Sequence, residues 1–131
     1  MAFDLSVIIT THRRPLLLSR AVQSIKQQGL DRVQLIVVSD VHEPQSYAVT
    51  NAQMGAGDIF VQRPGVPGPS ASRNMGVLLA QAPQVMFLDD DDSHAPDLLA
   101  KLLPLIPAGS QDVIVCDGYV AHESRQPDGV E

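Results

Sequence analysis

The amino-acid sequence predicts an α/β fold, a three-layer sandwich in which a mostly parallel sheet lies between two layers of helices. Apolar runs of strand length, at residues 5–10 and 33–38 among others, alternate along the chain with amphipathic segments of helical spacing. These runs are apolar along their length rather than at every second position, which is typical of parallel strands covered on both faces. With 131 residues the chain can build one core, and a single domain is expected.

The strands are predicted from short apolar, β-branched runs bounded by turn residues. We expect five of them, at residues 5–10, 33–38, 58–61, 85–88 and 113–116. The domain is expected to cover residues 1–122, because the polar segment 123–131 has the composition of a flexible tail.

Each predicted helix has a proline at its start, where the fixed φ and the missing N–H are tolerated: Pro15, Pro44, Pro69 and Pro96. Gly29 is expected to end the first helix, the second is expected to cover residues 44–54, and Pro104 is expected to end or kink the fourth. The third helix has an apolar face with the spacing i, i+3, i+4 and i+7, formed by Met75, Leu78, Leu79 and Ala82.

Composition and charge exclude some classes of function. The net charge is −6 and the pI is about 5.0, whereas nucleic-acid binders usually carry a basic face. Aromatic residues make up only 4%, so no stacking surface for single strands is expected. No apolar run approaches the roughly 20 residues of a membrane span, and the single cysteine, Cys116, suits a reducing compartment. We expect a cytoplasmic protein without nucleic-acid partners, with any membrane association carried by regions outside this chain.

The sharpest chemical feature is the run of four aspartates, residues 89–92, at the end of the fourth strand. Two unit charges 4 Å apart repel by about 1 kcal/mol even in bulk water. Mg²⁺ and Mn²⁺ bind carboxylate oxygens and often share them with substrate phosphates, so a divalent cation is expected here. The alternative is a solvated acidic turn in which Asp92 or Ser93 caps the next helix. The nearby His94 is expected to be an exposed loop residue rather than a ligand.

Other polar residues follow the first three strands, and ligands of parallel sheets bind at the carboxyl ends of strands. Residues 65–74 form a Gly/Pro loop that leads into a helix containing Arg73. This segment could be an anion-binding site or an ordinary loop before a helix, and we expect the two equally. Asp40 could accept hydrogen bonds from a base or ribose, or could stabilise a turn. A nucleotide could also contact the segment after the first strand, unless its threonines only cap the helix; this segment contains Thr10, Thr11, His12, Arg13 and Arg14.

Three blocks, residues 6–15, 68–76 and 87–92, resemble in order and spacing the N-terminal part of the family 2 glycosyltransferases. That family has the GT-A fold with a Rossmann-like nucleotide-binding half, and the similarity spans most of residues 4–118. The resemblance implies inverting transfer of a sugar from a nucleoside-diphosphate donor, commonly a UDP-sugar, to a hydroxyl of a saccharide or another acceptor. It also implies a divalent metal cofactor, Mn²⁺ or Mg²⁺.

The resemblance further implies roles for single residues. Asp89 and Asp91 match the family's DXD motif, with Asp91 as the direct metal ligand. The side chain of Asp89 or Asp90 is expected to face the ribose or the metal. Asp40 matches the acidic residue that usually recognises the base. The other nucleotide contacts are expected from Thr10, Thr11, Arg13 and Arg73.

The sequence departs from the family pattern in two ways. Ser39 and Asp40 stand where the family usually has two aspartates, which leaves the base preference open. Nothing after Cys116 resembles the family's second half with its acceptor site and general base, so a truncated chain with its general base elsewhere is expected. The alternatives are a non-catalytic module of a larger protein and a nucleotidyltransferase, which would normally have a Gly-rich segment with a lysine after the first strand.

Overall fold

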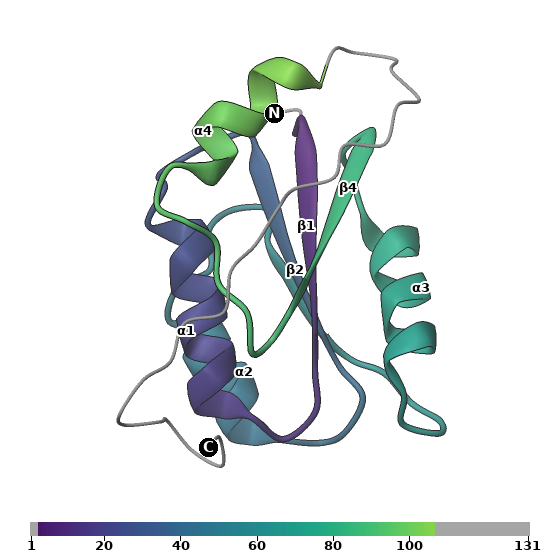
Figure 1. Ribbon diagram of the computed structural model, residues 1–131. Coiled ribbons are helices and arrows are strands. Elements are labelled where there is room, and N and C mark those ends of the chain that lie inside the picture. Colours follow the sequence, from purple (N-terminus) through teal and green to yellow (C-terminus); the bar gives the residue numbers. More distant parts are fainter. Residues whose placement is uncertain (1–2, 107–131) are drawn as a thin grey trace.

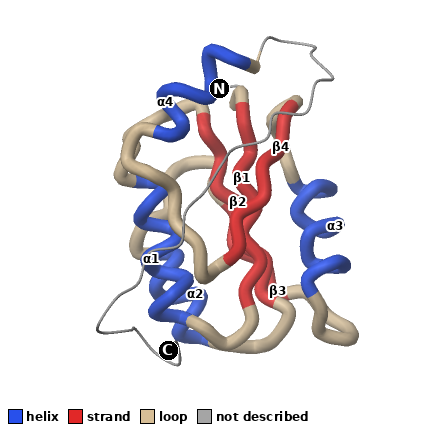
Figure 2. Tube along the Cα trace, viewed as in Figure 1, coloured by secondary structure: helices blue, strands red, loops and turns tan. Residues whose placement is uncertain are grey.

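A computed structural model describes residues 3–106 of the chain. At its centre is a sheet of four parallel strands in the order β3-β2-β1-β4 (Figure 2). Their bounds are Leu5–Thr11 for β1, Val33–Ser39 for β2, Ile59–Gln62 for β3 and Gln84–Asp89 for β4. The chain runs from β1 outward to β3 and then returns to the other side of β1. The strand order therefore reverses between β1 and β4, the position at which open α/β sheets bind ligands.

Helices cover both faces of this sheet and complete the predicted three layers (Figure 1). α1 (Pro15–Lys26), α2 (Pro44–Asn51) and α4 (Leu98–Leu102) lie on one face, and α3 (Pro69–Leu79) lies on the other. A 3₁₀ turn, Leu103–Leu105, follows α4 directly. The proline within this turn changes the type of helix, because its nitrogen cannot donate the next α-helical hydrogen bond.

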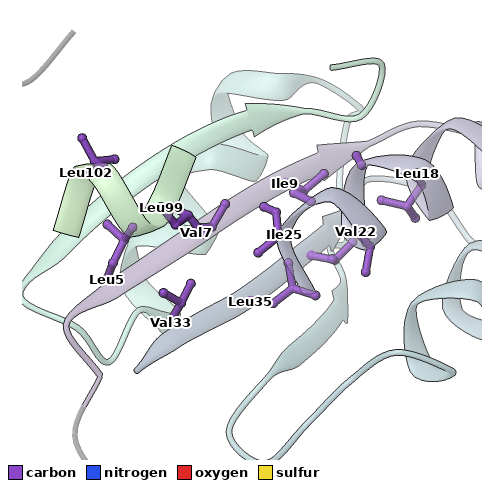
Figure 3. Close-up of a cluster of buried hydrophobic side chains, with 12 residues drawn as sticks. Leu5, Val7, Ile9, Leu18, Val22, Ile25, Val33, Leu35, Leu99 and Leu102 are labelled. Carbon is purple, nitrogen blue, oxygen red and sulfur yellow. The ribbon is translucent and has the colours of Figure 1, made fainter. Parts of the chain in front are cut away.

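Most of the hydrophobic core lies between the sheet and the layer that contains α1. Alternate residues of β1 face this side: Leu5, Val7 and Ile9 (Figure 3). They pack with α1 and with Leu99 of α4, whereas Ile8 packs under α3 on the opposite face. Each fully buried aliphatic side chain contributes about 1.5–3 kcal/mol relative to an exposed one. β1 is therefore held firmly from both sides, and the site lies at its carboxyl end.

α3 lies close to the sheet because a glycine faces β1. A Cβ atom at Gly76 would collide with the side chain of Ile8. The residues of α3 that face the sheet are Ser72, Met75, Gly76 and Leu79. The close approach at Gly76 fixes the position of α3 on the sheet. It thereby also fixes the position of Arg73 relative to the strand ends.

A buried polar network joins strands and loops near the amino ends of the strands. Ser6 Oγ donates a hydrogen bond to Gln34 Oε1 at 2.7 Å, and Gln34 Nε2 donates to the carbonyl of Gly57 at 2.9 Å. The backbone N–H of Gln81 donates to Gln34, and that of Ala82 donates to Ser6. Both buried polar side chains are thus hydrogen-bonded, as burial requires.

Two expectations about packing are wrong. Leu78 is 82% exposed, and Ala82 lies beyond the end of α3, so neither belongs to its buried face. The buried face is instead centred on Gly76, a position that a pattern of large apolar residues does not reveal. β4 is not covered on both faces, because α3 packs against β1 and β2 and leaves Val85 and Phe87 exposed.

The remaining differences concern the ends of elements. α2 ends at Asn51 rather than at residue 54, and α4 begins at Leu98 rather than at Pro96. The predicted fifth strand at 113–116 and the predicted tail at 123–131 lie outside the described residues. Among residues 3–106, none of the helices has both the length and the apolar character needed to cross a membrane.

Candidate functional site

The predicted site residues meet at the carboxyl ends of the strands, where the strand order reverses. Thr10 of β1 is paired in register with Asp89 of β4. An open cleft of about 310 Å³ lies at this edge. It is lined by residues from the ends of three strands and from the start of α3: Thr10, Thr11, His12, Arg14, Asp40, Pro69, Ser72, Arg73, Asp89, Asp90 and Asp91.

Asp90 differs from the other aspartates because its side chain points inward. It is 7% exposed, and its Oδ2 accepts a hydrogen bond of 2.9 Å from Thr11 Oγ1. Burial raises the pKa of Asp90 above its ordinary value, while the Thr11 hydrogen bond and the charge of Arg14 oppose this rise. The Thr11–Asp90 pair therefore joins the ends of β1 and β4 under the cleft.

The three other aspartates lie close enough together to share a cation. One carboxylate oxygen of each of Asp89, Asp91 and Asp92 lies within 4.8 Å of the other two, and all three residues are exposed. Burial raises the pKa of Asp92, and the charges of Asp91 and Asp89 raise it further. A cation would relieve this repulsion, and hard carboxylate oxygens suit Mg²⁺ or Mn²⁺. The residues therefore fit the expected metal. Asp92 does not cap α4, because Asp97 occupies that position.

Two arginines face this acidic cluster from opposite sides. Nη2 of Arg73 lies 3.1 Å from Oδ1 of Asp89. Nη1 of Arg14 lies 3.6 Å from Oδ1 of Asp90 and 3.5 Å from Oδ2 of Asp91. The two arginine side chains are 38% and 50% exposed, so these ion pairs are weak and easily exchanged for another anion. Both guanidinium groups can therefore reach an anionic ligand in the cleft.

Asp40 connects three segments of the cleft. Its Oδ1 lies 2.7 Å from Nδ1 of His12, and its Oδ2 accepts a hydrogen bond of 2.9 Å from the backbone N–H of Gly68. Its own backbone N–H donates to the carbonyl of Thr11 at 3.3 Å. Asp40 is only 7% exposed. It thus fixes the loops that follow β1 and β3 relative to the end of β2.

Arg63, which the sequence patterns did not single out, holds the Gly/Pro loop. It is 8% exposed. Its guanidinium donates to three backbone carbonyls, those of Pro64 at 3.1 Å, Val66 at 2.8 Å and Gly68 at 3.3 Å, and to Ser72 Oγ at 3.1 Å. The only signal in the sequence is a single arginine between a strand and a Gly/Pro loop. Arg63 therefore shapes the loop that carries the Gly68 N–H to Asp40.

Two positions lie elsewhere than the pattern suggested. Arg13 is exposed with a φ of 56°, and among the described residues it is Arg14, not Arg13, that lines the cleft. The expectation that His94 is exposed is wrong, since it is 7% exposed. Ser24 Oγ accepts a hydrogen bond from the His94 backbone N–H, and the Gln28 amide lies 3.4 Å from the His94 ring. Ser24 of α1 and Gln28, just beyond the end of α1, hold His94 inside the protein, where burial lowers its pKa.

Comparison with known proteins identifies the family. The sequence model described as Glycosyl transferase family 2 matches residues 6–129. The chain belongs to glycosyltransferase family 2. Membership of family 2 agrees with the resemblance of the three blocks and removes the nucleotidyltransferase alternative.

Curated relatives of this family 2 chain come from several bacteria. A GalNAc(5)-diNAcBac-PP-undecaprenol beta-1,3-glucosyltransferase of Campylobacter jejuni is 33% identical over 102 residues, which cover 76% of this chain and 33% of that protein. The minor teichoic acid biosynthesis protein GgaB of Bacillus subtilis is 33% identical over 94 residues, which cover 69% of this chain and 10% of that protein. The chain thus spans a third or less of the length of these two relatives.

Solved structures share the fold of this family 2 chain. S. aureus TarS in complex with UDP-GlcNAc has a TM-score of 0.72 at 21% identity, covering 79% of this chain and 31% of that one. The mannosyltransferase PcManGT from Pyrobaculum calidifontis, in complex with GDP-Man and Mn²⁺, has a TM-score of 0.67 at 19% identity, covering 82% and 34%. At these identities the likeness concerns the fold, which is the GT-A type that the family resemblance implied.

Proposed function

We propose that this chain is the donor-binding part of an inverting glycosyltransferase. The enzyme transfers a sugar from a nucleoside-diphosphate donor, a UDP-sugar, to an acceptor hydroxyl. One observation carries the proposal. Thr10, Asp40, Arg73 and the carboxylates of Asp89 and Asp91 all line one cleft at the strand-order reversal. That cleft combines cationic groups for a diphosphate, oxygen ligands for a divalent cation, and polar groups for a base or ribose.

Different side chains of the cleft bind different parts of the donor. Arg73 and Arg14 exchange their exposed carboxylate partners for the diphosphate oxygens. Asp91 and Asp89 would hold the metal, with Asp92 as a third oxygen donor. A bound Mn²⁺ or Mg²⁺ supplies Lewis-acid stabilisation of the departing diphosphate. Thr10, Thr11 and Asp90 form the wall between the strand ends. Asp40 is proposed for the base, and Arg13 remains a proposed nucleotide contact that does not line the cleft.

In the transfer itself, the acceptor oxygen forms a bond to the anomeric carbon as the bond from that carbon to the diphosphate oxygen breaks. The electron pair of the broken bond goes to the diphosphate. The acceptor proton goes to a general base that we place outside this chain. The domain that performs the donor-binding part covers residues 1–122 in this proposal, and a cytoplasmic location fits the single cysteine, Cys116.

The relatives support this donor class. TarS has been solved with UDP-GlcNAc and with UDP, PcManGT has been solved with GDP-Man and Mn²⁺, and the Campylobacter jejuni relative is named a glucosyltransferase. All of these ligands are nucleoside diphosphates or their sugars. A nucleoside diphosphate is therefore the shared chemistry that we extend to this chain, and the Mn²⁺ bound to PcManGT supports the divalent cation in the proposal.

Calorimetric titration of the chain with UDP, with and without Mn²⁺, tests the proposal. We expect UDP to bind in the presence of Mn²⁺ and to lose at least about tenfold in affinity when Mn²⁺ is omitted or when Asp91 is replaced in Asp91→Asn. Asp4→Asn is the matched control, because Asp4 is exposed and pairs with Arg32 away from the cleft. Absence of UDP binding, or binding indifferent to both Mn²⁺ and Asp91→Asn, would overturn the proposal.

A further inference from the structure

Two residues near the carboxyl end of α1 hold the segment that follows the acidic cluster. We infer that Ser24 and Gln28 are positioning residues for the divalent cation: they fix the chain just after Asp92 and thereby raise the affinity of the carboxylates for small ions such as Mg²⁺ relative to Ca²⁺. This inference rests on the proposed function, because it concerns the metal of the same cleft. Ser24 and Gln28 are not among the described residues that line the cleft, so they act through the main chain.

The last carboxylates of the acidic cluster lie on a segment that is neither helix nor strand. β4 ends at Asp89 and α4 begins at Leu98. At its start the segment is held by the pairing of β4 with β1 and by a hydrogen bond of 3.1 Å from the Asp92 N–H to the Asp89 carbonyl. His94 is the only buried residue of the range 91–97. The rigidity of the later carboxylates therefore depends on how the segment is held at His94.

Ser24 and Gln28 supply this second anchor. Ser24 Oγ donates to the carbonyl of Ala21 at 2.7 Å and accepts a hydrogen bond of 3.0 Å from the backbone N–H of His94. Gln28 Oε1 accepts a hydrogen bond of 2.8 Å from the backbone N–H of Leu99. Gln28 Nε2 donates to the carbonyl of Ser24 at 2.9 Å and lies 3.4 Å from His94 Nδ1. The segment is thereby tied to α1 both at His94 and at the start of α4.

The inward position of His94 depends on these bonds. His94 is 7% exposed, and its Nε2 atom is buried without a hydrogen-bond partner among residues 3–106. A buried polar atom that lacks a partner costs free energy, so Nε2 opposes this position and the bonds from Ser24 and Gln28 offset it. The Cα atom of His94 lies at most about 8 Å from that of Asp92, because the two are separated by two peptide units. The anchor therefore acts close to the carboxylates.

Rigidity matters at this place because the carboxylates repel one another. One oxygen of each of Asp89, Asp91 and Asp92 lies within 4.8 Å of the other two. Like charges at such distances repel even when they are exposed to water. A flexible segment would relax by moving the carboxylates apart, whereas an anchored segment keeps them together. Ser24 and Gln28 therefore maintain an arrangement that the repulsion would otherwise open.

A rigid set of oxygens discriminates between cations by their size. Mg²⁺ requires near-ideal octahedral geometry with oxygens at about 2.1 Å, whereas Ca²⁺ accepts about six to eight oxygens at about 2.3–2.6 Å in flexible geometries. A loosened segment should therefore lose more affinity for Mg²⁺ than for Ca²⁺. The ratio of the Ca²⁺ Kd to the Mg²⁺ Kd reports on the anchor, because partial unfolding would weaken both ions equally and leave this ratio unaltered.

Competition with Mn²⁺ measures this ratio. Electron paramagnetic resonance counts free Mn²⁺, so the displacement of bound Mn²⁺ by Mg²⁺ or by Ca²⁺ gives the Kd of each ion. The competition is run without nucleotide and again with UDP. Ser24→Ala and Gln28→Met should lower the ratio by about three- to tenfold, less than the roughly 10–100-fold loss of metal affinity when a group bonded directly to a ligand is removed. Ser24→Thr should keep the ratio of the unaltered chain, because a threonine hydroxyl can form the same bonds in a helix.

Gln53→Met is the matched control. Gln53 Nε2 donates to the carbonyl of Val49 at 3.3 Å, one turn earlier, and to that of Ser19 in α1 at 3.4 Å. This glutamine thus ties the end of α2 to α1 in the way that Gln28 ties the acidic segment to it. The variant removes a comparable set of hydrogen bonds and should keep the ratio of the unaltered chain.

Hydrogen exchange measured by NMR tests the same anchor without any metal. The Asp92 amide, which is bonded to the carbonyl of Asp89, should exchange faster in Ser24→Ala and in Gln28→Met. The amide of Arg63, which donates to the carbonyl of Ser39 at 2.7 Å, should exchange at the rate of the unaltered chain, because its loop is not held by these residues. Thermal melts confirm that each variant is folded before its ratio is interpreted.

The possible outcomes separate this inference from the proposed function. If the unaltered chain binds Mn²⁺ but Ser24→Ala and Gln28→Met keep its ratio, or if Gln53→Met lowers the ratio as much as they do, the inference is overturned while the proposed function stands. If the unaltered chain binds no Mn²⁺, either alone or with UDP, the proposed function is overturned and the inference with it. A lowered ratio in both variants, with Ser24→Thr and Gln53→Met unaltered, supports the inference.

Discussion

Nη2 of Arg73 lies 3.1 Å from Oδ1 of Asp89, so a carboxylate that fits a divalent cation is already paired with a cation of the protein. Arg73 is carried by α3 and Asp89 ends β4. The pair is open to solvent, with side chains 38% and 54% exposed. Metal and arginine therefore compete for Asp89, and a diphosphate would bind to both of them.

This competition predicts opposite effects of one substitution. Arg73→Gln should raise the affinity for free Mn²⁺ by about two- to fivefold, because an exposed ion pair contributes only up to about 1 kcal/mol. The same change should weaken UDP binding by about tenfold, because a charge-assisted contact to the diphosphate is lost. Calorimetric titrations with Mn²⁺ alone and with UDP measure the two effects. Arg32→Gln, at an exposed pair with Asp4, should change neither; parallel effects of Arg73→Gln on both ligands would contradict the explanation.

Arg63→Lys should loosen the Gly/Pro loop. A lysine cannot form the four contacts that the buried guanidinium makes, so we expect the free energy of unfolding to fall by about 2–3 kcal/mol. Hydrogen exchange of the Gly68 amide, which is bonded to Asp40, should become faster. Denaturant titration and exchange measured by NMR report the two effects. Arg32→Lys at an exposed site is the control, with an expected change within about 0.5 kcal/mol.

Gly76→Ala should destabilise the contact between α3 and β1. The added methyl group would collide with Ile8, and overpacking of this kind typically costs about 1–3 kcal/mol. Thermal or denaturant unfolding measures the loss. Gly68→Ala is the matched control, because nothing lies within 4 Å of a Cβ at that position and its backbone is extended. Equal stability of the two variants would show that α3 can move away from the sheet at no cost.

His94 predicts a dependence of stability on pH. Burial lowers its pKa below the ordinary value of 6.5, so between the two values the unfolded chain binds more protons than the folded chain. Stability therefore decreases as the pH falls below about 6.5. His94→Phe should reduce the difference in free energy of unfolding between about pH 7.5 and pH 5.5, measured with urea. The exposed His42→Phe variant should retain the difference, and an unaltered difference in His94→Phe would contradict this assignment.

The order and kind of the elements could be predicted from the sequence, because continuous apolar runs identify buried parallel strands and proline identifies helix starts. The error about the buried face of α3 has a physical cause. A hydrophobic pattern scores side chains by their size, whereas the closest approach of α3 to β1 needs a residue with no side chain, Gly76. The helix is thereby turned so that Leu78 faces solvent.

The cleft could be predicted only in outline. Strand ends locate Thr10, Asp40 and Asp89, since parallel strands place their carboxyl ends at one edge. The contacts between loops do not follow from local sequence. Arg63 and its carbonyl partners, and the pairing of His12 with Asp40, depend on how loops from different strands fold back on one another.

The way in which Arg63 holds its loop has a consequence for how the family can diversify. The guanidinium binds main-chain oxygens of Pro64, Val66 and Gly68, atoms that every amino acid has. The side chain of Val66 is not needed for the shape of the loop, and the residue is 84% exposed. Substitutions at Val66 can therefore accumulate without changing the backbone that supports Asp40. Evolution, or an engineer, can therefore change the exposed side chain at position 66 while the backbone of the loop keeps its shape.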